Sequence, residues 1–143
     1  MKIVVIDGQG GGVGKLLVEK LVEQSKKEEI SVEIYAIGAN SLASSAMLKG
    51  GAHYVATGEN PVVVNVADAQ CILGPVGIVV ANAMLGEITP TMATAIGSGK
   101  GKKFLVPMNH CGVFIAGVQG AKLPEYIDSA VAEAYEYLRR IKK

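Results

Sequence analysis

Five glycines between residues 8 and 14 are the feature of this sequence that points most directly to chemistry. They follow the branched apolar run Ile3-Val4-Val5-Ile6 and lie within Asp7-Gly8-Gln9-Gly10-Gly11-Gly12-Val13-Gly14-Lys15. Glycine lets backbone N–H groups approach an anion closely, and the start of a helix carries positive partial charge. The run therefore predicts that a nucleotide phosphate is bound where a strand passes into a helix.

The spacing of these glycines distinguishes three kinds of nucleotide-binding loop. A P-loop requires G-x-x-x-x-G-K-[ST], but Gln9 stands at its first glycine position and Leu16 at its hydroxyl position. Hydrolysis of a magnesium-bound nucleotide is therefore disfavoured. The Rossmann form G-x-G-x-x-G fails because Val13 stands at its third glycine position. The remaining pattern, G-x-x-x-G-x-G, is matched by Gly8, Gly12 and Gly14.

This last pattern resembles the cofactor loop of short-chain dehydrogenases. The resemblance implies NAD(P) or another nucleotide as the cofactor. It does not extend to their reaction, because none of the five tyrosines is followed four residues later by the lysine of the catalytic Tyr-x-x-x-Lys. Glycine-rich turns also occur where a strand and a helix merely pack tightly, so ligand binding and tight packing both stay open.

The rest of the loop and a second glycine turn complete the predicted ligand site. Asp7 would bond a ribose hydroxyl or fix the turn, and Gln9 would meet a ribose or phosphate oxygen. Lys15 would add charge or stay solvated. The turn at residues 74–77 should lie beside the first loop if the first and fourth strands are neighbours. The predicted cofactor-binding residues are Asp7, Gly8, Gln9, Gly10, Gly11, Gly12, Gly14, Lys15, Asn40, Ser41, Thr57, Gly58, Gly74, Pro75 and Gly77.

Two further polar segments follow predicted strands. The second strand leads into Gly38-Ala39-Asn40-Ser41 and lacks the acid that usually binds a ribose 2′-hydroxyl, which weakens the case for NAD in its usual mode. Asn40 and Ser41 would either cap the next helix or accompany a phosphate. The segment Thr57-Gly58-Glu59-Asn60-Pro61 fits ligand binding at the sheet edge and ordinary turn chemistry equally well.

Candidate catalytic residues occupy predicted strand ends and loops. Cys111 would attack a substrate only as the thiolate, and is otherwise an inert apolar side chain. Consecutive residues usually point apart, so His110 and Cys111 are expected to make a poor base and nucleophile pair. A second hypothesis is a small enzyme acting on a phosphorylated metabolite, and a third is a non-catalytic ligand sensor. The enzyme would use Asn109, Cys111, Glu59 and Glu87.

The elements that would position these residues alternate between strand and helix. Strands are predicted at 2–6, 32–37, 52–56, 71–73, 104–107 and, at an edge, 113–116. Helices are predicted at 13–26, 41–49, 90–96 and from 124, and tyrosines of this last helix are predicted to lie in a subunit contact. Residues 78–85 should begin as a helix, and residues 62–67 fit either a helix or a strand. This order predicts a Rossmann-like three-layer α/β sandwich, with a mostly parallel sheet of five or six strands and helices on both faces.

The composition narrows the class of protein. A length of 143 residues suits a single domain spanning 1–143, and a net charge of +1 offers no basic surface for nucleic acid or a membrane. The two cysteines match no disulfide framework or zinc spacing, so no metal is predicted. The uncharged stretch 69–86 is broken by glycine and proline, which argues against a membrane span. Without a signal peptide, the sequence predicts a cytoplasmic protein, and its apolar content predicts a homodimer.

Several longer segments are also distinctive: DGQGGGVGK, ANSLASSAMLKGGA, ATGEN, GPVGIVVANAMLGEITPTMATAIGS and VPMN-x-C. Together they resemble a family of short bacterial proteins known only as a domain of unknown function. The resemblance covers the chain up to about residue 117. It implies a compact Rossmann-like fold and no particular activity.

Overall fold

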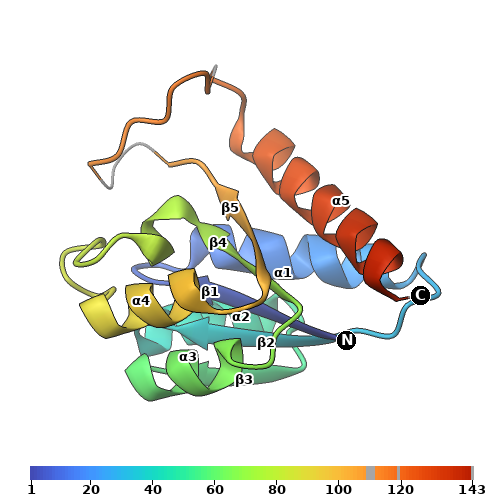
Figure 1. The fold of residues 1–143 in the computed structure, drawn as a ribbon, viewed down its shortest axis with the longest axis horizontal. Coiled ribbons are helices and arrows are strands. Elements are labelled where there is room, and N and C mark those ends of the chain that lie inside the picture. The colour runs from blue at the N-terminus through green and yellow to red at the C-terminus, as the bar shows by residue number, and fades with distance from the viewer. Residues whose placement is uncertain (109–111, 119, 143) are drawn as a thin grey trace.

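The fold is given by a computed structural model, which describes residues 1–108, 112–118 and 120–142. Five strands form one sheet in the order β3-β2-β1-β4-β5, and all neighbouring strands are parallel (Figure 1). The strands are β1 (Lys2–Asp7), β2 (Glu33–Gly38), β3 (Tyr54–Thr57), β4 (Cys71–Pro75) and β5 (Lys102–Val106).

Helices cover both faces of this sheet. Helices α1, α2 and α5 pack on one face, and α3 and α4 pack on the other (Figure 1). Their bounds are α1 (Gly12–Ser25), α2 (Ser41–Lys49), α3 (Glu59–Val66), α4 (Pro90–Ser98) and α5 (Leu123–Ile141), with a 3-10 turn η1 (Val76–Val79) after β4. The predicted three-layer α/β sandwich is confirmed. No helix in the described part of the chain is both long enough and apolar enough to cross a membrane.

The position of β1 in the sheet explains why its sequence is apolar without interruption. Ile3 and Val5 lie in the core beneath α1 and α5, whereas Val4 and Ile6 lie in the core beneath α3 and α4. All four side chains are fully buried. A central parallel strand is covered on both faces, so neither set of alternating positions can be polar.

Helix α5 packs its apolar stripe against the core shared with α1. Tyr135 is fully buried, and its hydroxyl donates a hydrogen bond of 2.9 Å to the carbonyl of Leu21. The prediction that Tyr135 lies in a subunit contact is therefore wrong. Tyr126 and Tyr137 are half-buried against the same core.

The structure assigns one segment that the sequence left open and corrects two other predictions about the elements. Residues 62–67 belong mainly to helix α3, because Val62 and Val66 are buried four positions apart. The helical start expected at 78–85 is limited to η1, because Asn82, Met84 and Leu85 have positive φ angles. No strand forms at 113–116, so that prediction is wrong. The segment is flanked by Gly112 and Gly117 at φ 75° and 86°. Its backbone does not pair with the sheet, and Phe114 and Ile115 border a cavity.

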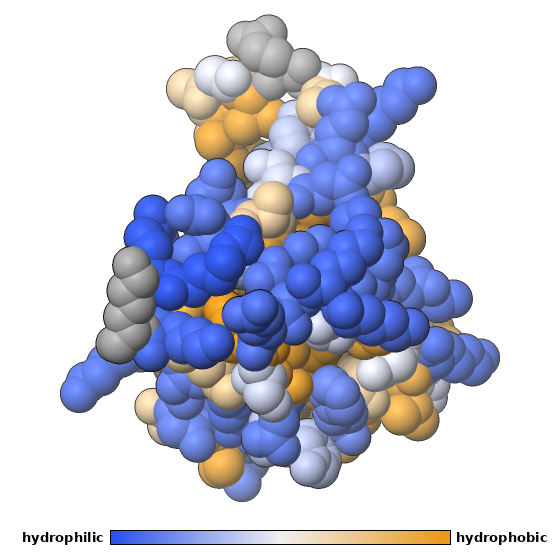
Figure 2. All heavy atoms as spheres, turned by 90° about the vertical axis from the view of Figure 1, so that its right-hand side faces the viewer, coloured by the Kyte–Doolittle hydropathy of each residue, from blue (hydrophilic) through white to orange (hydrophobic). Residues whose placement is uncertain are grey.

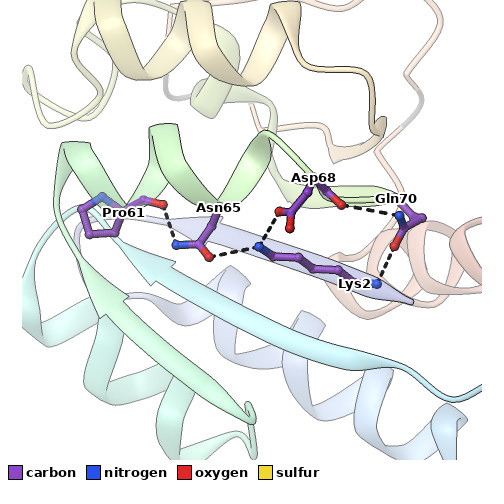
Figure 3. A network of polar contacts seen from close by, with 5 residues as sticks. All are labelled: Lys2, Pro61, Asn65, Asp68 and Gln70. Atoms are coloured by element: carbon purple, nitrogen blue, oxygen red, sulfur yellow. Dashed lines mark hydrogen bonds and ion pairs between the residues drawn. The ribbon is translucent and has the colours of Figure 1, made fainter.

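The amino edge of the sheet is fastened by a polar network around Lys2 (Figure 3). Its Nζ donates to Asp68 Oδ1 at 2.6 Å and to Asn65 Oδ1 at 3.1 Å, and its backbone N–H donates to Gln70 Oε1 at 2.6 Å. The hydrogen bond from Lys2 lowers the pKa of Asp68. These contacts hold β1 against the connection from α3 to β4, at the edge opposite the glycine loop.

Candidate functional site

The glycine loop lies at the carboxyl edge of the sheet, between the end of β1 and the start of α1. Gly11 has φ 73°, and its N–H donates to the carbonyl of Gly8 at 2.9 Å, which closes the turn. Strand β1 is central, with β2 on one side and β4 on the other. From β1 the chain adds strands first on one side, β2 and β3, and then on the other, β4 and β5. Open α/β sheets bind ligands at the point where the strand order reverses in this way.

Asp7 fixes the loop from within. The residue is 4% exposed, and its carboxylate accepts hydrogen bonds from the N–H of Gly8 at 2.8 Å and of Gly14 at 2.7 Å. It therefore takes one of the unpaired N–H groups that every helix has at its start. Fixing the turn, one of the two roles predicted for Asp7, is the role that these hydrogen bonds perform.

Glu87 reaches the same loop from the connection between β4 and α4. Its Oε1 accepts hydrogen bonds from the N–H of Gln9 at 2.8 Å and from Asn40 Nδ2 at 2.9 Å. Asn40 also donates to the carbonyl of Gln9 at 3.0 Å, and its Oδ1 caps α2 by accepting from the N–H of Ala43 at 2.9 Å. Glu87 thus provides a carboxylate beside the end of β2, where the sequence of that strand offers none. Sequence reasoning missed this contact, which joins residues 78 positions apart.

Packing inside the protein requires glycine at two of the five loop positions and crowds a third. A Cβ at Gly8, Gly11 or Gly14 would lie respectively 2.7 Å from Glu87 Oε1, 2.7 Å from Ala43 Cα and 2.6 Å from Met47 Sδ. Real Cβ atoms do not make contacts this short. At Gly11 and Gly14 the Cβ would meet the backbone of Ala43 or the Cβ of Asp7, so tight packing explains these two glycines. At Gly8 it would meet the ends of Glu87 and Met84, which would have to move.

Gly10 and Gly12 are different. A Cβ at either position would meet nothing within 4 Å, and neither residue has a positive φ angle. Within the described residues, the N–H groups of Gly10, Gly12 and Val13 donate no hydrogen bond to another part of the protein. Packing does not explain these two glycines, and they leave three amides open at the start of α1.

A cavity of about 260 Å³ opens in front of these amides. Its described lining contains no lysine or arginine. Apart from the loop, the cavity is lined by Leu16, Pro75, Met84, Met108 and Leu123. The positive end of α1 therefore faces a cavity with mainly apolar walls.

The second glycine turn lies beside the first, as predicted. Strand β4 pairs with β1, Val5 lies opposite Leu73, and Pro75 lines the same cavity as the loop. Gly74 is required by packing, because a Cβ there would collide with the carbonyl of Ile6. The carbonyl of Gly77 accepts the N–H of Val80 at 3.0 Å, so this glycine belongs to the turn η1.

The other predicted binding residues do not line the glycine-loop cavity. Thr57 Oγ1 lies 2.6 Å from Ser44 Oγ, which joins β3 to α2. Gly58, at φ 109°, precedes α3. Glu59 accepts a hydrogen bond from the Thr89 hydroxyl at 2.6 Å, and this hydroxyl also caps α4. Ser41 is exposed, and Lys15 is half-buried.

The predicted cysteine chemistry falls outside the described residues. Asn109, His110 and Cys111 all lie there, and their roles stay predictions. Cys71 is fully buried in β4, and burial raises the pKa of its thiol to about 12, so it is not a thiolate at neutral pH. No three His, Cys, Asp or Glu side chains within the described residues are grouped so that they could hold a metal ion.

Residues 2–139 match the family described as "Domain of unknown function (DUF3842)". The chain belongs to this family. The match confirms the resemblance seen in the sequence segments, and the family description names no activity. No curated protein matches the sequence.

Three solved structures cover nearly the whole chain at low sequence identity. A dodecameric FMN-dependent UbiX-like decarboxylase from Escherichia coli is 14% identical, with a TM-score of 0.48 and coverage of 96% of this chain and 94% of its own. A mutant of YwlE arginine phosphatase is 14% identical, with a TM-score of 0.41 and coverage of 99% and 93%. A low molecular weight protein tyrosine phosphatase from Bacillus subtilis is 13% identical, with a TM-score of 0.40 and coverage of 99% and 95%. At these TM-scores they carry no information about ligand or reaction here.

Proposed function

We propose that this member of the DUF3842 family binds a nucleotide or dinucleotide, with a phosphate held by the N–H groups of Gly10, Gly12 and Val13. The observation that carries the proposal is the pair of glycines that packing does not require, Gly10 and Gly12. They face a cavity at the positive end of a fourteen-residue helix, and their amides have no partner within the described residues. Backbone amides and the helix dipole are sufficient to hold a phosphate.

The charged groups around the loop favour one kind of phosphate group over another. The carboxylates of Asp7 and Glu87 each accept a hydrogen bond from a loop amide, and no basic side chain lines the described cavity. A terminal phosphate carries nearly two negative charges at neutral pH, whereas each phosphate of a pyrophosphate diester carries one. Repulsion from the two carboxylates therefore favours the pyrophosphate of a dinucleotide over a phosphomonoester.

Thermal shift and titration calorimetry with NAD, ADP-ribose, AMP and FMN test the proposal. A ligand at 100 times its dissociation constant should stabilise the protein by about 2.7 kcal/mol. We expect NAD and ADP-ribose to bind, and AMP and FMN to bind more weakly. Gly12→Asp should abolish binding because it adds a carboxylate at the phosphate site, where the open space accommodates it.

Gly97→Asp is the matched control. Gly97 lies in α4, is exposed, and also has nothing within 4 Å of a Cβ. This variant should bind NAD like the natural protein. Binding that is equal in the Gly12→Asp and Gly97→Asp variants, or no binding of any of the four compounds, would contradict the proposal. The small-enzyme and ligand-sensor hypotheses and the homodimer stay predictions.

A further inference from the structure

A second cavity lies next to the glycine-loop cavity. Its volume is about 310 Å³, and it is formed between the end of β5 and the start of α5. Met108 and Leu123 line both cavities, which makes the two adjacent. The remaining walls include Pro107, Phe114 and Tyr126.

We call this second cavity the ring cavity. Its lining is apolar and includes the aromatic side chains of Phe114 and Tyr126. Within the described residues, no charged side chain contributes to it. Phe114 is 89% exposed and Val118 is 41% exposed, so the cavity presents apolar surface to water. Figure 2 shows hydrophobic surface at the top of the molecule, beside a face that is mostly hydrophilic. An exposed phenylalanine at a cavity next to a polar loop is typical of a binding site rather than of a core.

We propose that the ring cavity receives the planar, uncharged ring of a dinucleotide whose pyrophosphate lies on the glycine loop. This inference rests on the proposed function. Each cavity alone is at or below the lower limit of about 300 Å³ for a ligand pocket, whereas the two together lie well within the usual range. Flat rings stack favourably on aromatic side chains, and Phe114 and Tyr126 provide two of these.

The matched ligands NADH and ADP-ribose test this assignment. They share the adenosine, the pyrophosphate and the second ribose, and only NADH carries the uncharged dihydronicotinamide ring. NADH should bind about tenfold more tightly than ADP-ribose, since stacking a ring on an aromatic side chain has about this effect or more. The fluorescence of NADH should also rise when its ring leaves water.

The variant Phe114→Ser separates the ring from the phosphate. We expect it to fold normally because Phe114 is exposed, to bind NADH no more tightly than ADP-ribose, and to leave the affinity for ADP-ribose unchanged. Leu85→Ser is the control: Leu85 is 99% exposed and does not line the ring cavity. It should keep the tenfold preference for NADH.

The failures of the two proposals are distinguishable. If NADH and ADP-ribose bind equally well to the natural protein, or if Phe114→Ser weakens both to the same degree, the ring cavity is wrongly assigned and the phosphate site stands. If neither compound binds, both proposals fail.

Discussion

Asp7 and Glu87 set the number of loop amides that a ligand can use. Asp7 accepts the N–H groups of Gly8 and Gly14, and Glu87 accepts that of Gln9. The carboxylates act as internal anions that hold the turn in shape without a ligand. A phosphate that meets this preformed loop has little backbone entropy left to lose on binding.

Asp7→Asn should destabilise the protein by about 1–3 kcal/mol, because a buried N–H loses its acceptor. The asparagine keeps one acceptor oxygen, but its NH₂ group would face the N–H of Gly8 or Gly14. Urea denaturation measures the change. Asp128→Asn is the control: Asp128 is exposed on α5, its ion pair with Lys20 is open to solvent, and the change should cost less than about 1 kcal/mol. Equal effects of the two variants would show that the carboxylate of Asp7 is not needed for the turn.

At the scale of elements, α1 is placed by the glycines at its start. Gly11 lets the turn approach α2, and Gly14 lets α1 approach both β1 and Met47 of α2. Met47 is fully buried. The loop geometry and the packing of two helices on the sheet are therefore specified by the same residues.

Gly14→Ala and Gly12→Ala form a matched pair on this helix. The Cβ at position 14 would lie 2.8 Å from the Cβ of Asp7, so we expect a loss of about 1–3 kcal/mol in the free energy of unfolding. The Cβ at position 12 enters open space, and Gly12→Ala should be neutral or stabilise by up to about 1 kcal/mol. Denaturant titrations of both variants decide the point, and a neutral Gly14→Ala would contradict this account of the packing.

Most helices and strands could be predicted because the residue patterns that specify them involve only neighbouring positions in the sequence. The buried run of β1, the Thr89 cap before Pro90 and the apolar stripe of α5 each depend on neighbouring residues, and each agrees with the structure. Residues 62–67 could not be assigned, since a row of valines fits a strand and a helix. The strand predicted at 113–116 was wrong because apolar side chains can line a cavity as well as cover a sheet.

The site was less predictable than the fold for the same physical reason. The loop glycines all fall within residues 8–14, so their place at the strand-to-helix turn could be predicted. Which of them pack and which stay open depends on Ala43, Met47 and Glu87, which belong to other elements. No local pattern reports contacts of that kind.

At the scale of the whole molecule, buried titratable groups link stability to alkaline pH. Burial raises the pKa of the Cys71 thiol from 9.0 to about 12, and burial also raises the pKa of Tyr135 above its ordinary value of 10.0. Between the unfolded and the folded pKa, the unfolded chain loses the proton and the folded protein keeps it. The free energy of unfolding therefore falls as pH rises through this window.

We expect the natural protein to lose stability between pH 9 and 10 with a contribution from Cys71 approaching about 1.4 kcal/mol per pH unit. Cys71→Ala removes this contribution and should give a shallower slope over that interval, although its stability at pH 7 is lower because of the cavity left behind. Tyr135 contributes chiefly above pH 10 in both proteins. Urea denaturation at four pH values measures the slopes, and identical slopes would show that the thiol of Cys71 does not control this loss.

The hydrogen bond between Tyr135 and Leu21 joins residues 114 positions apart. During synthesis on the ribosome, the side of α1 that α5 will cover stays uncovered until α5 has emerged. Long-range contacts of this kind form late and slowly, and they leave apolar surface exposed in the meantime. We therefore expect the nascent chain to expose this apolar side of α1 to water until α5 has been synthesised.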